Sequence, residues 1–235
     1  MLTCSPCNVN IQANGDCGTK TDEQHQKEGA AHLEGLISKI KDIVNSSSPK
    51  YKKTKQLIKF FTDTLDMQRI PILVARIKQS AFTAEQLREY IDLFPQTVVR
   101  DYLPFLINNP IDTFKVKTPL TITKRSSGPM ISGTVSVKFT SGDFREITIK
   151  FSECGQGYKI QDALFDGAGL VFQAREKLRK IIKPNSAEGT EEEKNRIKIQ
   201  RLLENLRDSK KTYDESDQKD REVSSLSGDS KKVVS

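Results

Sequence analysis

The hydrophobic pattern of this chain changes period near residue 110, and that change constrains the fold more than any other feature. Before it, apolar residues recur every three or four positions, as in helices that bury one face. After it, apolar and polar residues alternate for about fifty residues, as in strands that bury one face of a sheet. Helical spacing resumes near residue 170. The order predicts an α+β domain in which N-terminal and C-terminal helices cover a curved antiparallel sheet of about four or five strands.

The helices before the sheet have recognisable boundaries. Apolar stripes predict helices over residues 32–45 and 50–65. A third helix is expected to start near Ile70, because Pro71 suits a first helical turn, where its missing N–H costs nothing. The sequence from Thr83 to Gln86 is a capping box, in which side chains satisfy two backbone donors at the start of a helix.

The helical segment that the capping box opens should not remain one straight rod. Its apolar spacing continues to Phe105, but Pro95 and Pro104 each remove a helical hydrogen bond and should interrupt it. Beyond the strands, helical spacing runs from Leu170 to Lys183, and a last helix capped by Thr190 is expected to run to about residue 208. A curved sheet closed over by such helices is a natural container, and periodicity leaves open whether its interior is filled.

Composition divides the chain into three parts. Residues 1–31 are polar and glycine-containing and predict a flexible arm, and residues 209–235 balance acids against bases and predict a disordered tail. Residues 32–208 therefore form the expected single domain. The first residues show neither a basic region followed by an apolar one nor a small-residue cleavage site, which alone predicts a chain that is not exported.

The net charge of +7 is concentrated in the expected domain. Seven lysines gather in its first two helices, at positions 39, 41, 50, 52, 53, 55 and 59. A basic face of this kind favours anionic headgroups, an acidic partner or nucleic acid, although it can also be a simply solvated helix surface. Apart from Tyr51, these lysines are not interleaved with exposed aromatics, and no recognised nucleic-acid module is present, so no nucleic-acid partner is expected.

The four cysteines do not predict a metal site. Cys4, Cys7 and Cys17 lie in the polar N-terminus, with no second close pair and no histidines at ligand spacing. A disulfide among these three is possible in an oxidising compartment, and it would leave Cys154 over. No metal and no cofactor are expected.

Catalytic constellations are scarce. His25 and His32 are the only histidines and lie near the N-terminus, which disfavours a nucleophile–histidine arrangement, and no phosphate-binding loop is present. Asp162 is the strongest candidate, because strict alternation would place it beside Ile160 and Leu164 as a general base in an apolar pocket. It could equally pair with a basic neighbour or lie at the end of the sheet. The chain is therefore not expected to be an enzyme.

Two segments resemble a known family. The first runs from Leu65 to Leu106 and includes the capping box at 83–86. The second runs from Tyr158 to Leu170 and is followed by Arg175 and apolar residues at helical spacing. Together they resemble the MlaC family, also called the toluene-tolerance family of periplasmic phospholipid-binding proteins.

The second segment carries the more specific part of the resemblance. The family typically has an aspartate in its last strand, then an acid and a glycine, ahead of a helix that contains an arginine. Asp162, Asp166, Gly167 and Arg175 match these places. The chain departs from the pattern in having no tryptophan, and in having Ala168 and a glycine where a serine is usual.

The resemblance implies a cavity-bearing cone that holds acyl chains. It implies a soluble, periplasmic phospholipid shuttle between an outer-membrane lipoprotein complex and an inner-membrane ABC transporter complex, maintaining the lipid asymmetry of the outer membrane. Two alternatives remain: a small-molecule enzyme on the same scaffold that uses Asp162, and an interaction module with a filled core. The candidate lipid-binding residues are Ile70, Val74, Ile77, Tyr90, Phe94, Val98, Val135, Val137, Ile147, Ile149, Ile160 and Leu164.

Overall fold

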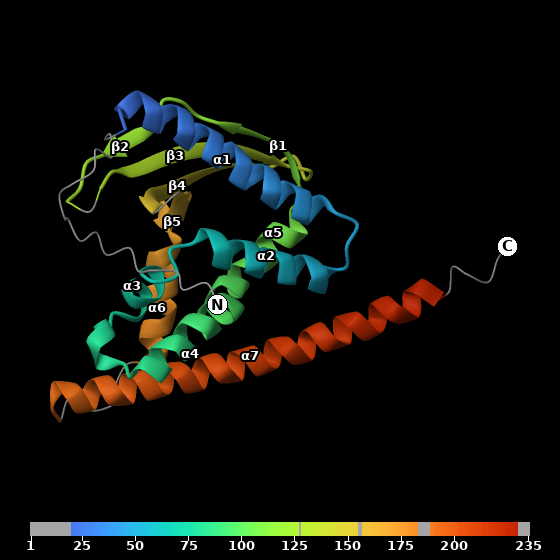
Figure 1. Cartoon of the computed structure of the whole chain (residues 1–235). Helices are drawn as coiled ribbons and strands as arrows, with labels where there is room; N and C mark the ends of the chain where they lie inside the picture. Colours follow the sequence, from blue (N-terminus) through green and yellow to red (C-terminus); the bar gives the residue numbers. More distant parts are fainter. Residues whose placement is uncertain (1–19, 127, 155–156, 183–188, 230–235) are drawn as a thin grey trace.

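The structure is a computed structural model that describes residues 20–126, 128–154, 157–182 and 189–229. Helices, then strands, then helices follow one another, as the change in period predicts (Figure 1). The first helical elements are α1 (Asp22–Asn45), α2 (Lys50–Thr64), α3 (Ile70–Ala75), η1 (Gln79–Ala81), α4 (Ala84–Phe94), η2 (Pro95–Val99), η3 (Arg100–Tyr102) and α5 (Leu103–Asn108). The strands are β1 (Ile111–Val116), β2 (Thr121–Thr123), β3 (Met130–Phe139), β4 (Phe144–Cys154), β5 (Gly157–Phe165) and β6 (Ala168–Gly169), followed by α6 (Leu170–Ile182) and α7 (Glu191–Asp229).

The strands form one antiparallel sheet of six strands, which confirms the α+β class and adds the short β6 to the expected strands. The order is β1-β3-β4-β5-β6, and β2 also pairs with β3. Helix α1 runs across one face of this sheet (Figure 1). The two approach closely because β3 has a glycine at the crossing: a Cβ on Gly133 would lie 2.2 Å from Cδ1 of Leu33.

Two apolar cores hold the molecule together. The first joins the sheet to α1, α2 and α5 and includes Leu33, Leu57 and Phe151, which are fully buried. The second joins α3, α4, α6 and α7 and includes Tyr90 and Leu202. Such burial is the main favourable contribution to folding. The two cores meet at a cavity that residues of both line.

The predicted helix signals are confirmed around α4. The backbone N–H of Gln86 donates to the Thr83 hydroxyl at 3.2 Å, and the backbone N–H of Thr83 donates to the Gln86 side-chain oxygen at 3.0 Å. The α-helix ends before Pro95, and the chain continues as the π-helix η2 and the 3₁₀-helix η3 before α5, which contains Pro104 in its first turn. Proline thus interrupts the segment as expected.

The N-terminal arm is shorter than predicted. Helix α1 begins at Asp22, so the expectation of a flexible arm up to residue 31 is wrong from that point, and residues 1–19 lie outside the described residues. A capping box between Thr21 and Gln24 starts the helix. The side chain of Gln26 then receives the N–H of Leu120 at 2.6 Å and donates to its carbonyl at 2.5 Å, which fixes the polar first turns to the sheet.

The C-terminal tail is also corrected. Helix α7 does not stop near residue 208 but continues to Asp229, and residues 230–235 lie outside the described part. The helix passes α6 and α4 and continues beyond them (Figure 1). No helix of the described residues combines the length and apolar character that a membrane crossing requires.

Polar contacts fix the second half of α7 to η3. The Arg100 guanidinium donates to both carboxylate oxygens of Asp217 and stacks over the ring of Tyr213, with 4.6 Å to the ring centroid. The Tyr213 hydroxyl donates to Asp101. Arg100 and Asp217 are largely buried, with side chains 12% and 17% exposed, so this pair is less screened than a surface ion pair.

The expected cysteine arrangement is corrected as well. Cys154, at the end of β4, is disulfide-bonded rather than left over, and its partner lies outside the described residues. The described residues contain no cluster of histidines, cysteines and carboxylates that could hold a metal ion.

Candidate functional site

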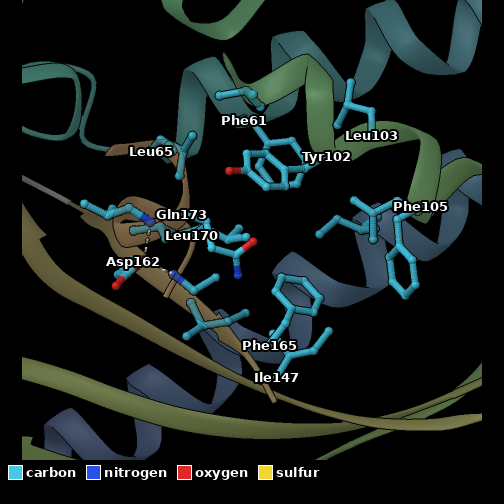
Figure 2. Close-up of a pocket in the computed structure, with 18 of the residues that line it drawn as sticks. Phe61, Leu65, Tyr102, Leu103, Phe105, Ile147, Asp162, Phe165, Leu170 and Gln173 are labelled. Carbon is cyan, nitrogen blue, oxygen red and sulfur yellow. Dashed lines mark hydrogen bonds between the residues drawn. The ribbon is translucent and has the colours of Figure 1, made fainter. Parts of the chain in front are cut away.

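A cavity of about 430 Å³ lies where the two cores meet. Figure 2 shows Phe61, Tyr102 and Phe105 from the helices facing Ile147 and Phe165 from the sheet across it. The volume lies within the range of about 300–1,000 Å³ that small-molecule pockets occupy. The interior is therefore partly open, which answers the question that periodicity left open.

The cavity walls come from elements far apart in the sequence. Helix α1 contributes Leu36, Ile37 and Ile40 from the same stripe that packs on the sheet. The π-helix η2 contributes Val98 and Val99, and its irregular turn is a feature that is frequent at functional sites. These walls are almost entirely apolar, so the cavity is suited to hydrocarbon.

Most of the predicted lipid-binding residues lie in this lining. The structure brings them together from α3, α4, η2 and three neighbouring strands. They are Ile70, Val74, Phe94, Val98, Val137, Ile147, Ile149 and Ile160.

Four predicted residues lie elsewhere. Ile77 and Tyr90 belong to the second core, and the Tyr90 hydroxyl donates to the carbonyl of Pro71 at 2.8 Å. Val135 is fully buried in the first core. Leu164 is half-buried and lines a second hollow instead. Helical or strand spacing identified these residues as buried or alternating, but it could not separate solid core from cavity wall.

A β-bulge explains the position of Leu164. Lys150 pairs with Asp162 while the next residue, Phe151, pairs with Ile160, so Gln161 is an extra residue in β5. The bulge reverses the alternation, and Ala163 and Phe165 rather than Leu164 line the main cavity with Ile160.

The extra residue is itself fixed. The side-chain amide of Gln161, only 7% exposed, donates to Oδ2 of Asp66 and to Oγ of Ser152, both at 2.9 Å. The backbone N–H of Asp66 donates to the carbonyl of Ile160 at 2.9 Å. The bulge therefore joins β5 to the turn between α2 and α3, which holds two walls of the cavity together.

Strict alternation placed Asp162, Ile160 and Leu164 on one face of the sheet. The bulge separates them, because Ile160 lines the main cavity and Leu164 lines the second hollow. Asp162 lies at the cavity edge, and its Oδ1 accepts the backbone N–H groups of Ala163 at 2.9 Å and Val171 at 3.1 Å (Figure 2). Val171 is in the first turn of α6, so the carboxylate satisfies a free donor there and interacts favourably with the helix dipole. The geometry gives Asp162 a structural role at the junction of β5 and α6.

Neither His25 nor His32 lines this cavity. The His32 ring lies between Phe151 and Tyr158, with centroids 5.3 and 5.1 Å away, and burial lowers the pKa of His32. Among the described lining residues there is no histidine, cysteine or serine that could form a nucleophile–base pair with Asp162.

A few polar groups reach the cavity edge. Asp101 accepts from Tyr213 and forms an ion pair with Lys177. Burial raises the pKa of the Tyr102 phenol, and nearby Asp101 adds to the shift. Arg145 faces Asp166 at 3.9 Å between Nη1 and Oδ2. The wall is thus apolar with charged groups at its rim, the arrangement that fits an amphipathic ligand.

The lysines of α1 and α2 divide into two groups. Lys41 donates to the carbonyl of Asp112 at 2.5 Å, Lys53 donates to that of Val44 at 2.7 Å, and Lys59 pairs with an acid four residues on. The exposed remainder are Lys39, Lys50, Lys52 and Lys55. Part of the basic window therefore serves the fold, and part remains available on the surface.

Sequence reasoning missed much of the lining. The missed apolar residues are Leu36, Ile37, Ile40, Phe61, Leu65, Val99, Tyr102, Leu103, Phe105, Leu106, Ile111, Phe139, Ala163, Phe165, Leu170, Val171 and Ala174. Most continue the same apolar stripes, which was the available signal. Ala163 and Phe165 carried none, because a bulge has no clear mark in a single sequence.

Comparison with solved structures supports the fold. The chain is similar to a phospholipid-binding protein from Ralstonia solanacearum whose structure was solved in complex with a phospholipid, with a TM-score of 0.58 and 16% sequence identity. The alignment covers 80% of this chain and 97% of that one. The likeness shows that the two proteins share a fold. No protein-family model and no curated protein sequence matches this chain.

Proposed function

We propose that this protein binds a phospholipid by enclosing its acyl chains in the apolar cavity. The observation that carries the proposal is the cavity of about 430 Å³, lined by residues of both cores. The shared fold with a phospholipid-binding protein of Ralstonia solanacearum supports it. The resemblance of residues 158–170 to the MlaC family points the same way.

The free energy of transfer is sufficient for such binding. Burying one methylene gains about 0.8 kcal/mol, so about ten buried methylenes gain roughly 8 kcal/mol before the costs of association. The costs of association offset part of that gain, so each further methylene that the cavity buries adds directly to the net affinity.

The proposal extends to transport. A phospholipid shuttle would move between an outer-membrane lipoprotein complex and an inner-membrane ABC transporter complex, and would maintain the lipid asymmetry of the outer membrane. The exposed lysines of α1 and α2, such as Lys50 and Lys52, would contact acidic surfaces of these partners. A periplasmic location is proposed with it, and the disulfide of Cys154 favours an oxidising compartment of that kind.

Transfer between vesicles tests the shuttle. Donor vesicles carry a fluorescent phospholipid with a quencher, acceptor vesicles carry neither, and the protein is added at increasing concentration. A shuttle should raise the rate of dequenching in proportion to protein concentration. A rate equal to spontaneous exchange at every concentration would contradict the proposal.

A further inference from the structure

The rim of the cavity carries one cationic side chain. Arg145, near the start of β4, is the only lysine or arginine among the described residues that line the cavity. Its guanidinium forms no hydrogen bond within the described part of the chain, and its ion-pair partner is Asp166, with 3.9 Å between Nη1 and Oδ2. That distance is well beyond the 2.7–2.9 Å or so of a charge-assisted hydrogen bond, so the guanidinium donors remain free for another acceptor.

The other charges of the lining are already satisfied. Asp101 is held by Lys177 and Tyr213. Asp162 accepts the backbone N–H groups of Ala163 in β5 and of Val171 at the start of α6. Among the charged lining residues, this leaves Arg145 and Asp166 as the pair that can exchange their mutual contact for contacts with a ligand.

Arg145 and Asp166 also face a second hollow. This hollow, of about 490 Å³, is lined by both residues and by polar side chains of β3 and β4. Its lining is Ser136, Phe144, Arg145, Glu146, Thr148, Leu164, Asp166 and Gly167. The pair therefore stands at the boundary between an apolar space and a space with hydroxyl and carboxylate groups.

Asp166 is held in an unusual backbone conformation. It has φ of 50° in the turn between β5 and β6, where Gly167 follows with φ of 82°. Aspartate and asparagine tolerate this left-handed region better than most residues. The turn thus places Asp166 at the rim, where its side chain is 69% exposed.

We propose that Arg145 and Asp166 form a headgroup subsite that selects a zwitterionic phospholipid with a terminal ammonium group. This inference rests on the proposed function and adds the class of lipid. The phosphate binds Arg145, whose planar guanidinium suits a phosphodiester. The ammonium binds Asp166 on the side of the second hollow, because Glu146 there is already paired with Lys117, and the acyl chains lie in the apolar cavity.

Competition between two lipids with the same acyl chains tests this inference. The purified protein is equilibrated with mixed vesicles of phosphatidylethanolamine and phosphatidylglycerol, separated from them, and its lipid measured by mass spectrometry. The wild type should retain phosphatidylethanolamine about tenfold over phosphatidylglycerol, because only phosphatidylethanolamine offers an ammonium group to Asp166. Glycerophosphoethanolamine, which lacks acyl chains, should not displace the lipid at equal concentration. Displacement would overturn the inference, because the pair would then recognise a soluble phosphodiester.

Two variants separate the roles. Arg145→Gln should lower retention of both lipids about tenfold, because both have a phosphate. Asp166→Asn keeps a residue that tolerates the left-handed turn and should bring the preference for phosphatidylethanolamine close to parity. Arg179→Gln and Asp63→Asn, which change the same charges at exposed pairs away from both hollows, should leave retention and preference unchanged.

The outcomes distinguish the headgroup subsite from the proposed binding of lipid in the cavity. Retention of lipid without headgroup preference, or a preference that survives Asp166→Asn, would overturn the headgroup subsite alone. Failure of the wild type to retain either lipid would overturn the proposed function and this inference with it. Thermal unfolding of each variant identifies any loss that reflects misfolding, and Arg145→Lys should then restore part of the retention.

Discussion

Oδ1 of Asp162 accepts the backbone N–H of Val171 at 3.1 Å, and this contact joins the end of β5 to the start of α6. Both elements line the cavity, so the contact also connects two of its walls. A residue that sequence reasoning singled out as a possible base thus has a defined structural contact.

Replacing Asp162 with alanine should lower the free energy of unfolding by about 1–2 kcal/mol, because the backbone N–H groups of Val171 in α6 and of Ala163 in β5 lose their acceptor. Urea denaturation measures the change, and Asp63→Ala at the exposed Lys59 pair is the control with little effect. Bound lipid should persist in folded Asp162→Ala. Unchanged stability would show that the contact does not hold the junction.

Gly133 and Gly35 should respond oppositely to alanine. A Cβ on Gly133 would meet Leu33 at 2.2 Å, so Gly133→Ala should push α1 from the sheet and destabilise the protein by about 1–3 kcal/mol. Gly35, in the same helix as Leu33, has nothing within 4 Å of such a Cβ, and Gly35→Ala should stabilise by about 0.5–1 kcal/mol. Melting temperatures of the two variants that shift in the same direction would contradict the predicted packing of α1.

Local signals in the sequence predicted much of this fold, and long-range contacts account for most of what they missed. The Thr83 capping box, the interruption at Pro95 and the change to strand period depend on neighbouring residues, so a short window contains them. The polar start of α1 has a local capping box at Thr21 and Gln24 that the prediction overlooked, and it is also held by the contact between Gln26 and Leu120, ninety-four positions apart. No local window shows that pairing.

Local signals and long-range contacts also differ in how well they predict the cavity lining. Residues such as Val137 and Ile149 were predicted because they alternate within regular strands. Beyond the bulge at Gln161 the alternation reverses, so Leu164 lines the second hollow, and Phe165, which was not predicted, lines the cavity. The bulge is stabilised by Asp66, which comes from a different part of the chain.

The C-terminal half of α7 should depend on its contacts with η3. Asp217→Asn leaves the largely buried Arg100 without its carboxylate and should cost about 1–3 kcal/mol in that region. Hydrogen exchange should show faster exchange for residues 209–224, with little change in α4. Asp214→Asn, which removes an exposed pair with Lys210, is the matched control. Equal hydrogen exchange of residues 209–224 in both variants would show that the ion pair with Arg100 does not stabilise this half of α7.

His32 should make stability depend on pH. Burial lowers the pKa of His32, so the unfolded chain binds a proton near pH 6.5, its ordinary value, before the folded protein does. This contribution to stability is present above about pH 6.5 and is lost as the pH falls from there toward the lower pKa of the folded state. Urea denaturation at pH 7.5 and 5.5 should show a larger loss for wild type than for His32→Gln. An NMR titration that gives His32 a pKa of 6.5 or higher would contradict the assignment.

Native mass spectrometry of the intact protein measures the central claim most directly. Wild type purified from a bacterial host should carry the mass of a phospholipid, and Val98→Phe, which places a larger side chain in the cavity wall, should lose most of it. Val223→Phe, at an exposed position on α7, makes the same change outside the cavity and should retain the lipid. Wild type that remains free of lipid after incubation with phospholipid vesicles, or equal lipid content in both variants, would contradict a cavity that holds acyl chains.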